Sequence, residues 1–221
     1  MRTLIRELPY ERPIAGGRYR YERDGQPTGA VESWRLSRAA DDYRFLRVDL
    51  NAQMARSGHS YLYHQTVGPD GRPDRLSFRF FGRGRQIRGE LLFEDEHVTL
   101  TRYVDRQRLE DELQLPSGYL FWFPSTAGLS LLARLEETGA RPALTLAPDE
   151  DFILCTTEIS GTAKPAQTIE VMGKPIRTRP LVLTWANQER IIWLDQHRWP
   201  LRMQRDGLLA VETRYLRYGA R

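Results

Sequence analysis

The sequence contains one cysteine and two lysines, and it has no long apolar run. The single cysteine, Cys155, excludes an intramolecular disulfide and any metal site built from several cysteines. No stretch reaches the roughly 18–20 consecutive apolar residues that a membrane-spanning helix needs. The N-terminal residues 1–9 have no apolar core of the length that a signal peptide requires, so we expect a cytoplasmic protein.

The sequence also lacks long segments in which all charged residues have the same sign. Arginine supplies 31 of the 33 basic residues, and the formal net charge is +4. This strong preference for arginine over lysine indicates codon bias rather than selection for a basic surface. The 29 acidic residues are scattered between the arginines, and no single-sign block forms. Nucleic acid is therefore an unlikely partner.

Sequence motifs of common enzyme and metal sites are missing. The four histidines are His59, His64, His97 and His197, and no two of them have the spacing of metal ligands. The sequence has no Ser in a G-x-S-x-G turn and no complete Gly-rich dinucleotide loop. Cys155 lies in an apolar strand pattern and is more readily explained as a small core residue than as a nucleophile. We expect neither metal nor cofactor, and no specific enzymatic reaction is indicated.

Short strands joined by turns account for most of the chain. Residues 17–22 alternate aromatic and charged side chains, which is typical of a half-buried strand. Because most connections in the first hundred residues are short, the strands they join should be antiparallel. Strands are predicted at residues 17–22, 30–36, 43–50, 60–67, 75–81, 86–93, 98–104, 151–160, 167–172, 176–185, 189–195, 200–205 and 208–218.

One long helix is predicted in the middle of the chain. Leu129, Leu132 and Leu135 recur at near-helical spacing within residues 124–138, and Gly139 follows. Residues 105–115 are charged and weakly helical. About a dozen antiparallel strands with one helix favour an all-β fold, in which a curved half-barrel or open barrel wraps around the helix. We predict a single domain over residues 1–221.

A ligand site is predicted where large aromatic side chains meet the inner face of such a sheet. The most apolar pentapeptide is Tyr119-Leu-Phe-Trp-Phe123, which fits either core packing or the lining of a pocket. The arginines of residues 79–88, interleaved with aromatics, suit either an exposed hairpin tip or an acidic headgroup. The predicted ligand-binding residues are Trp34, Phe121, Phe123, Trp185, Trp193, Arg79 and Arg88.

The C-terminal hairpin resembles that of a known family. In residues 191–203 an apolar strand ends in Asp195, and Pro200-Leu-Arg begins the return strand. This hairpin, the opening Gly17-Arg-Tyr-Arg-Tyr21 and the apolar segment at residues 120–135 resemble the half-barrel family of the bacterial lipoprotein carrier and receptor (LolA/LolB) and VioE. The resemblance implies a concave apolar cavity for an acyl chain or an aromatic intermediate. The family's glycine is missing from the turn, where Trp199 stands before Pro200.

These observations predict a bacterial protein that binds a hydrophobic or amphipathic small molecule without catalysis. Burial of apolar ligand surface, at about 25 cal/mol per Å², would supply the affinity. One alternative is a small VioE-like enzyme that shapes an aromatic or lipid intermediate. Another is a protein-interaction module without a cavity. The oligomeric state does not follow from the sequence.

Overall fold

The protein has a mainly antiparallel β fold with one long helical segment, as the sequence predicts. The computed structural model describes residues 8–82, 84–137 and 139–218, with sixteen strands among them. The strands are β1 (Arg12–Arg23), β2 (Gln26–Arg38), β3 (Arg44–Ala52), β4 (His59–Val67), β5 (Pro73–Gly82), β6 (Arg85–Phe93), β7 (His97–Val104), β8 (Gln107–Gln114), β9 (Leu120–Phe121), β10 (Arg141–Ala147), β11 (Ile153–Ala163), β12 (Gln167–Val171), β13 (Lys174–Trp185), β14 (Gln188–Leu194), β15 (Pro200–Arg205) and β16 (Leu208–Arg217). Three 3-10 segments complete the described elements: η1 (Ala40–Asp42), η2 (Ala127–Glu137) and η3 (Pro148–Glu150).

Contacts within the chain divide it into two compact units. The first comprises Met1–Arg18, Ala30–Leu115 and Arg214–Arg221, and the second comprises Tyr19–Gly29 and Pro116–Thr213. Strands β1, β2 and β16 pass from one unit into the other. The single-domain assignment stays a prediction.

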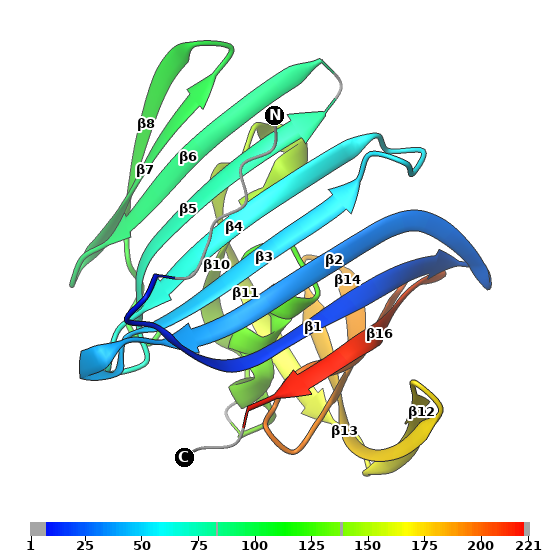
Figure 1. Ribbon diagram of the computed structural model, residues 1–221. Coiled ribbons are helices and arrows are strands. Elements are labelled where there is room, and N and C mark those ends of the chain that lie inside the picture. Colours follow the sequence, from blue (N-terminus) through cyan, green and yellow to red (C-terminus); the bar gives the residue numbers. More distant parts are fainter. Residues whose placement is uncertain (1–7, 83, 138, 219–221) are drawn as a thin grey trace. The chain divides into compact units, whose positions relative to one another are not determined.

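In the first unit the strands follow one another as a meander (Figure 1). Their order is β8-β7-β6-β5-β4-β3-β2-β1-β16. One face of this sheet carries a row of buried side chains that are directly opposite one another: Trp34 on β2, Val48 on β3, Tyr63 on β4 and Phe78 on β5. Each is 1–2% exposed. Alternation along the strands puts these side chains in the core of the unit.

Residues 107–114, expected to be weakly helical, form strand β8 instead. The prediction was wrong because Leu109 and Leu113 recur at a spacing of four, which suits a helix, while the backbone conformation was decided by the preceding turn and the neighbouring strand. Asp105 and Arg106 have φ values of 48° and 73°, which suit a two-residue hairpin turn. β8 then pairs with β7 along its whole length.

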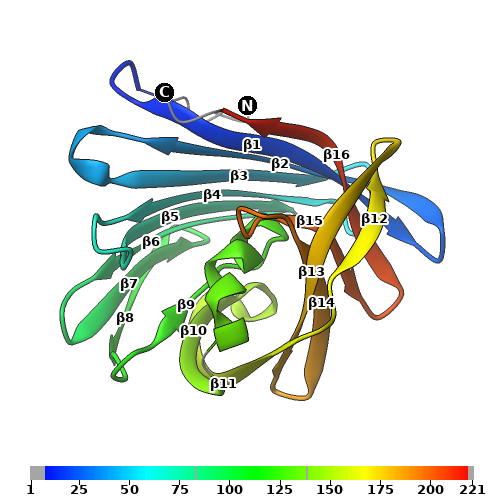
Figure 2. The same ribbon diagram turned by 90° about the horizontal axis from the view of Figure 1, so that it is seen from below.

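In the second unit the strand order is β2-β1-β16-β15-β14-β13-β11-β10-β9, and β12 pairs separately with β13. Figure 2 shows η2 among these strands, and it contacts β9, β11 and β15. The helix predicted over residues 124–138 is thus observed at Ala127–Glu137, and residue 138 lies outside the described residues. Leu129, Leu132 and Leu135 of η2 are fully buried, so the predicted apolar stripe is the packed face.

Candidate functional site

The hairpin of β13 and β14 positions an arginine on the inner side of the second unit. Its two-residue turn, with φ values of 43° at Ala186 and 60° at Asn187, fixes the register. As a result Arg190 is directly opposite Leu183, which is fully buried. Trp185 lies two residues from Leu183 on the same strand and therefore on the same face. The hairpin thus directs a guanidinium group toward the buried aromatic side of the sheet.

Arg190 has an aromatic neighbour, but no described carboxylate forms an ion pair with it, although the charge of Asp206 acts on its pKa. Its guanidinium carbon lies 4.7 Å from the centre of the Trp185 ring. Its Nε atom is buried, and Arg190 has neither a hydrogen bond nor an ion pair to any described residue. Burial, followed by the charge of Arg205, lowers the pKa of Arg190 to about 10. The side chain is therefore still charged at neutral pH, in surroundings that disfavour the charge.

Further aromatic and hydroxyl groups of the same unit are connected to this arginine through Trp185 and Tyr21. Trp122 packs edge-on against Trp185, with ring centres 5.5 Å apart and an angle of 70° between the rings. The hydroxyls of Tyr21 and Thr126 are 2.7 Å apart and hydrogen-bonded to each other. Tyr21 is close enough to Arg190 to act electrostatically on its pKa. We call Tyr21, Trp122, Trp185, Arg190 and Arg205 together the Arg190 site.

Of the predicted aromatic residues, four occupy buried positions in the second unit, and Trp193 is 8% exposed. Phe121 in β9, Phe123 after it and Trp185 at the end of β13 are 5%, 0% and 7% exposed. Trp193 belongs to the same unit but lies three residues after Arg190 on β14, and therefore on the opposite face. There its ring lies 5.7 Å from the guanidinium of Arg202. Trp34 belongs to the core of the first unit, as described above.

The two predicted arginines are exposed neighbours in the first unit. Arg79 and Arg88 are directly opposite each other on β5 and β6. Each occupies the face opposite to the buried Phe78 row, because Phe78 immediately precedes Arg79. The guanidinium of Arg88 lies 4.4 Å from the centre of the Tyr103 ring. The structure therefore places these two arginines on the exposed side of their sheet, and a cavity that joins them to the aromatic residues stays a prediction.

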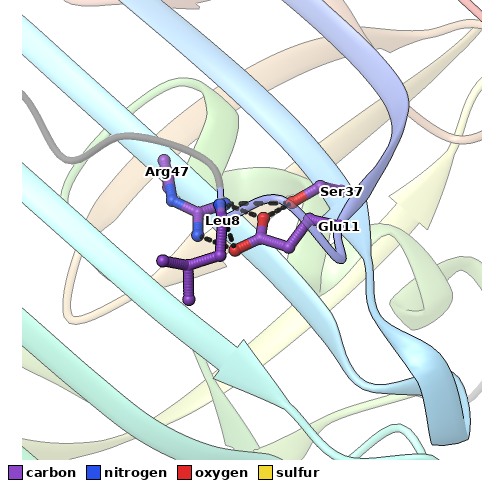
Figure 3. Close-up of polar contacts among 4 residues, drawn as sticks. All are labelled: Leu8, Glu11, Ser37 and Arg47. Carbon is purple, nitrogen blue, oxygen red and sulfur yellow. Dashed lines mark hydrogen bonds and ion pairs between the residues drawn. The ribbon is translucent and has the colours of Figure 1, made fainter.

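A buried polar cluster fastens the N-terminal part of β1 to the first unit. Figure 3 shows the carboxylate of Glu11 between Arg47 and Ser37. Two guanidinium nitrogens of Arg47 donate to the two carboxylate oxygens at 2.6 and 2.7 Å, and the Ser37 hydroxyl also donates to Glu11. The Leu8 backbone N–H adds a further hydrogen bond at 3.2 Å. All charges in this cluster are paired, so we assign it a structural role.

His64 lies beside this cluster but does not share its hydrogen bonds. It is directly opposite Arg47 in the β3–β4 ladder, and its Nε2 atom is buried without a hydrogen-bond partner among the described residues. Burial and the charge of Arg47 lower the pKa of His64 to about 4, so the imidazole is neutral at neutral pH.

Sequence reasoning missed Arg190, although a signal for it was present. The short connection between the predicted strands at residues 176–185 and 189–195 and the alternation along those strands were sufficient to put Arg190 and Trp185 on one face. Tyr21 was predicted as a strand residue, and only the tertiary structure brings it to Arg190. Trp122 belongs to the apolar pentapeptide at residues 119–123, for which core packing was one of the two interpretations, and the structure buries both Phe121 and Trp122.

No helix in the part of the chain that the structure describes is long and apolar enough to cross a membrane. Within that same part, no three His, Cys, Asp or Glu side chains form a group that could hold a metal ion.

Comparisons with known proteins give a fold-level result. No family model matches the sequence, and no curated protein matches it. Among solved structures, the chain is similar to the crystal structure of a β-barrel-like protein of domain of unknown function DUF1849 from Brucella abortus. The similarity covers 94% of this chain and 98% of that chain, with a TM-score of 0.55 and 14% sequence identity. It supports a β-barrel-like fold, which is coarser than the resemblance to LolA/LolB and VioE.

Proposed function

We propose that the protein binds an acidic amphipathic small molecule, whose anionic group contacts Arg190 and whose apolar part packs against the aromatic side chains of the Arg190 site. The observation that carries this proposal is the mostly buried guanidinium of Arg190, which has no anionic partner among the described residues.

A guanidinium removed from water without a counter-ion is destabilising. Stacking on Trp185 recovers part of this free energy, about 0.5–2 kcal/mol for a cation over an aromatic ring. It leaves the buried Nε donor of Arg190 unsatisfied, since a ring face accepts hydrogen bonds poorly. A ligand carboxylate or phosphate supplies both the missing charge and the acceptor oxygens.

Aromatic neighbours favour an amphipathic ligand over a simple ion. Tyr21, Trp122 and Trp185 are 6%, 2% and 7% exposed, so the anion would bind beside an apolar environment. This agrees with the acyl or aromatic ligands that the resemblance to LolA/LolB and VioE implies. A cytoplasmic location is part of the proposal, because a fold with one cysteine needs no oxidising compartment.

Acid–base catalysis has less support than binding. General acid–base groups work best when their pKa lies near the working pH. Burial raises the pKa of Tyr63 well above its usual value, while the pKa of Arg190 is about 10 and that of His64 is about 4. All three shifts leave these groups away from neutrality, so none of them is prepared for proton transfer there.

The test is a titration of the protein with decanoate in which binding is monitored by tryptophan fluorescence. Decylamine, which has the same chain length and a positive charge, is the control ligand. We expect decanoate to bind and decylamine not to bind. Arg190→Gln should weaken decanoate binding by about tenfold or more, which corresponds to 1.4 kcal/mol. Arg177→Gln, which removes an exposed arginine from β13, is the matched control and should bind as the original protein does. Equal binding of decanoate by both variants, or no binding by the original protein, would contradict the proposal.

A further inference from the structure

We infer that the anionic group recognised at the Arg190 site is a phosphate rather than a carboxylate. This inference rests on the proposed function, and it names the chemical class of the ligand's acidic group. Its basis is that the site holds more than one guanidinium.

A second arginine approaches Arg190 from the neighbouring strand. Ile191 pairs with Gln204 in the β14–β15 ladder, so Arg190 and Arg205 occupy the next position on the two antiparallel strands. The charge of Arg205 acts directly on Arg190 and disfavours its charged form. Two neighbouring guanidinium groups on one face repel each other, and an anion bound between them would remove this repulsion. The Arg205 side chain is 41% exposed, so water screens part of the repulsion.

A third arginine, on β1, contacts the turn between β15 and β16, which directly follows Arg205. Arg23 donates through Nη1 to the backbone carbonyl oxygen of Asp206 at 3.3 Å. It lies two residues after Tyr21 and therefore on the face that carries the Tyr21 hydroxyl. The backbone N–H of Asp24 also donates to the Gly207 carbonyl at 3.2 Å, which joins the β1–β2 turn to the β15–β16 turn. The three arginines thus gather at one end of the second unit.

The carboxylate of Asp206 neutralises the charge of these three arginines only weakly. Its carboxylate lies 3.7 Å from the Arg205 Nε atom, and its side chain is 84% exposed. Ion pairs this exposed contribute little because water screens them. The Asp206 carboxylate acts on Arg190 through its charge and raises the pKa of Arg190, but it forms no hydrogen bond with it, so the buried Nε donor of Arg190 remains available to an anionic ligand.

Phosphate satisfies this arrangement better than carboxylate does. A phosphate monoester carries about −1.5 to −2 charges at pH 7 and three strong acceptor oxygens. A carboxylate carries one charge and two oxygens, so it can neutralise one of two adjacent guanidinium groups. The planar fork of arginine also matches phosphate oxygens in bidentate geometry. The same chemistry occurs in a phosphorylated lipid and in free phosphate, and the experiment separates these two sources.

The experiment compares decyl phosphate, decanoate and inorganic phosphate by calorimetric titration of the full chain. We expect decyl phosphate to bind about tenfold or more tightly than decanoate at about pH 8, where the phosphate is a dianion. Arg205→Gln should remove this preference, because it should weaken decyl phosphate binding about tenfold more than it weakens decanoate binding, which corresponds to 1.4 kcal/mol. Arg177→Gln should keep the preference. Inorganic phosphate should bind much more weakly than decyl phosphate, because it lacks the apolar chain.

The pH dependence provides an independent readout. The second ionisation of a phosphate monoester has a pKa of about 6, so the preference for decyl phosphate should fall between about pH 8 and pH 5.5. Carboxylates stay ionised over most of this range, since their pKa is about 4. Decanoate binding should therefore change little.

The possible outcomes distinguish this inference from the proposed function. Equal binding of decyl phosphate and decanoate, both dependent on Arg190, would overturn the phosphate inference and leave the proposed function standing. Absence of binding by either amphiphile and by inorganic phosphate would overturn both. Inorganic phosphate that binds as tightly as decyl phosphate would support phosphate recognition from a free source and would overturn the amphipathic part of the proposed function.

Discussion

Arg47 on β3 and His64 on β4 are directly opposite each other, yet only Arg47 takes part in the buried hydrogen bonds to Glu11. The side chain of Arg47 is 4% exposed and that of Glu11 is fully buried. A fully paired ion pair and a neutral imidazole thus share one site on the sheet of the first unit. Their responses to mutation and to pH should differ accordingly.

Glu11→Gln should destabilise the protein strongly. The substitution leaves the buried guanidinium of Arg47 without its anion, and losing one partner of a buried pair costs about 3–5 kcal/mol. The free energy of unfolding, measured by urea denaturation, should fall by this amount. Glu110→Gln breaks the exposed pair between Glu110 and Arg108 and should cost about 0–1 kcal/mol. Equal effects of the two substitutions would show that burial of the Glu11 pair adds nothing.

Acidification should reduce stability through Glu11 at low pH. Burial by itself would raise the pKa of Glu11, but the hydrogen bonds from Arg47, Ser37 and the Leu8 backbone outweigh it and lower the pKa below its usual value. A carboxyl whose pKa is lower in the folded state stabilises the fold above its unfolded pKa and loses this contribution as the pH falls through the folded pKa. Urea denaturation of the original protein should show this loss below about pH 4, and Glu11→Gln should lack it. A loss that persists unchanged in the variant would assign it to other groups.

His64 should weaken the fold at mildly acidic pH. Its pKa is about 4 in the folded protein and about 6.5 when unfolded, so the unfolded chain binds the proton more readily. Stability should therefore decline as the pH falls from about 6.5 to about 4, and His64→Gln should flatten this part of the profile. A histidine NMR titration provides the direct measurement. A midpoint for His64 near its ordinary value would contradict the expectation.

Arg190→Met should stabilise the ligand-free protein while it removes ligand binding. The substitution keeps an unbranched side chain against Trp185 and eliminates a mostly buried charge that has no anionic partner. Even buried ion pairs can be replaced by well-packed apolar groups with a gain of about 1–4 kcal/mol. A buried charge that forms no ion pair should be at least as favourable to replace. The melting temperature without ligand should rise, whereas Arg177→Met on the exposed side should change stability by about 0.5 kcal/mol or less. A lower melting temperature for Arg190→Met would mean that Arg190 is structural.

Gly161→Ala should loosen the contact between β11 and η2. A Cβ atom at Gly161 would lie 2.7 Å from the Leu135 Cβ and 3.2 Å from its backbone carbon, so a backbone segment would have to shift. Overpacking of this kind costs about 1–3 kcal/mol of the free energy of unfolding. Thr162→Ala, at the next and exposed position, is the control and should change stability by about 0.5 kcal/mol or less. Unchanged stability of Gly161→Ala would show that η2 adjusts freely.

The fold class was predictable because it depends on local patterns. Turn residues such as Asp206-Gly207, with φ values of 44° and 73°, alternate with period-two strands along most of the chain. The buried stripe of η2 was also visible as leucine spacing. Residues 105–115 show the limit of this approach, since their charged composition suggested a weak helix while pairing with β7 made residues 107–114 a strand.

The candidate site was less predictable because it depends on faces and on contacts between distant residues. Trp193 and Trp185 were assigned one shared role, although they lie on opposite faces of the β13–β14 hairpin. Arg79 and Arg88 were selected for their aromatic neighbours in sequence, yet the pleat directs them away from the buried Phe78 row. A shift of one position in a strand moves a side chain to the other face of the sheet. The amino-acid composition of the strand does not determine which face is chosen.

The sequence by itself determined the antiparallel strands, the helix that packs among them and the positions of most turns, because each follows from interactions between residues close in the chain. Only the tertiary structure decided which charges are paired. Glu11 forms an ion pair with Arg47, which is 36 residues away in the chain. Arg190 lies over the Trp185 ring and forms no ion pair with any residue that the structure describes. Hydrogen bonding and burial depend on which side chains meet when strands that are distant in the sequence pack together. The order of residues along the chain does not by itself specify these contacts.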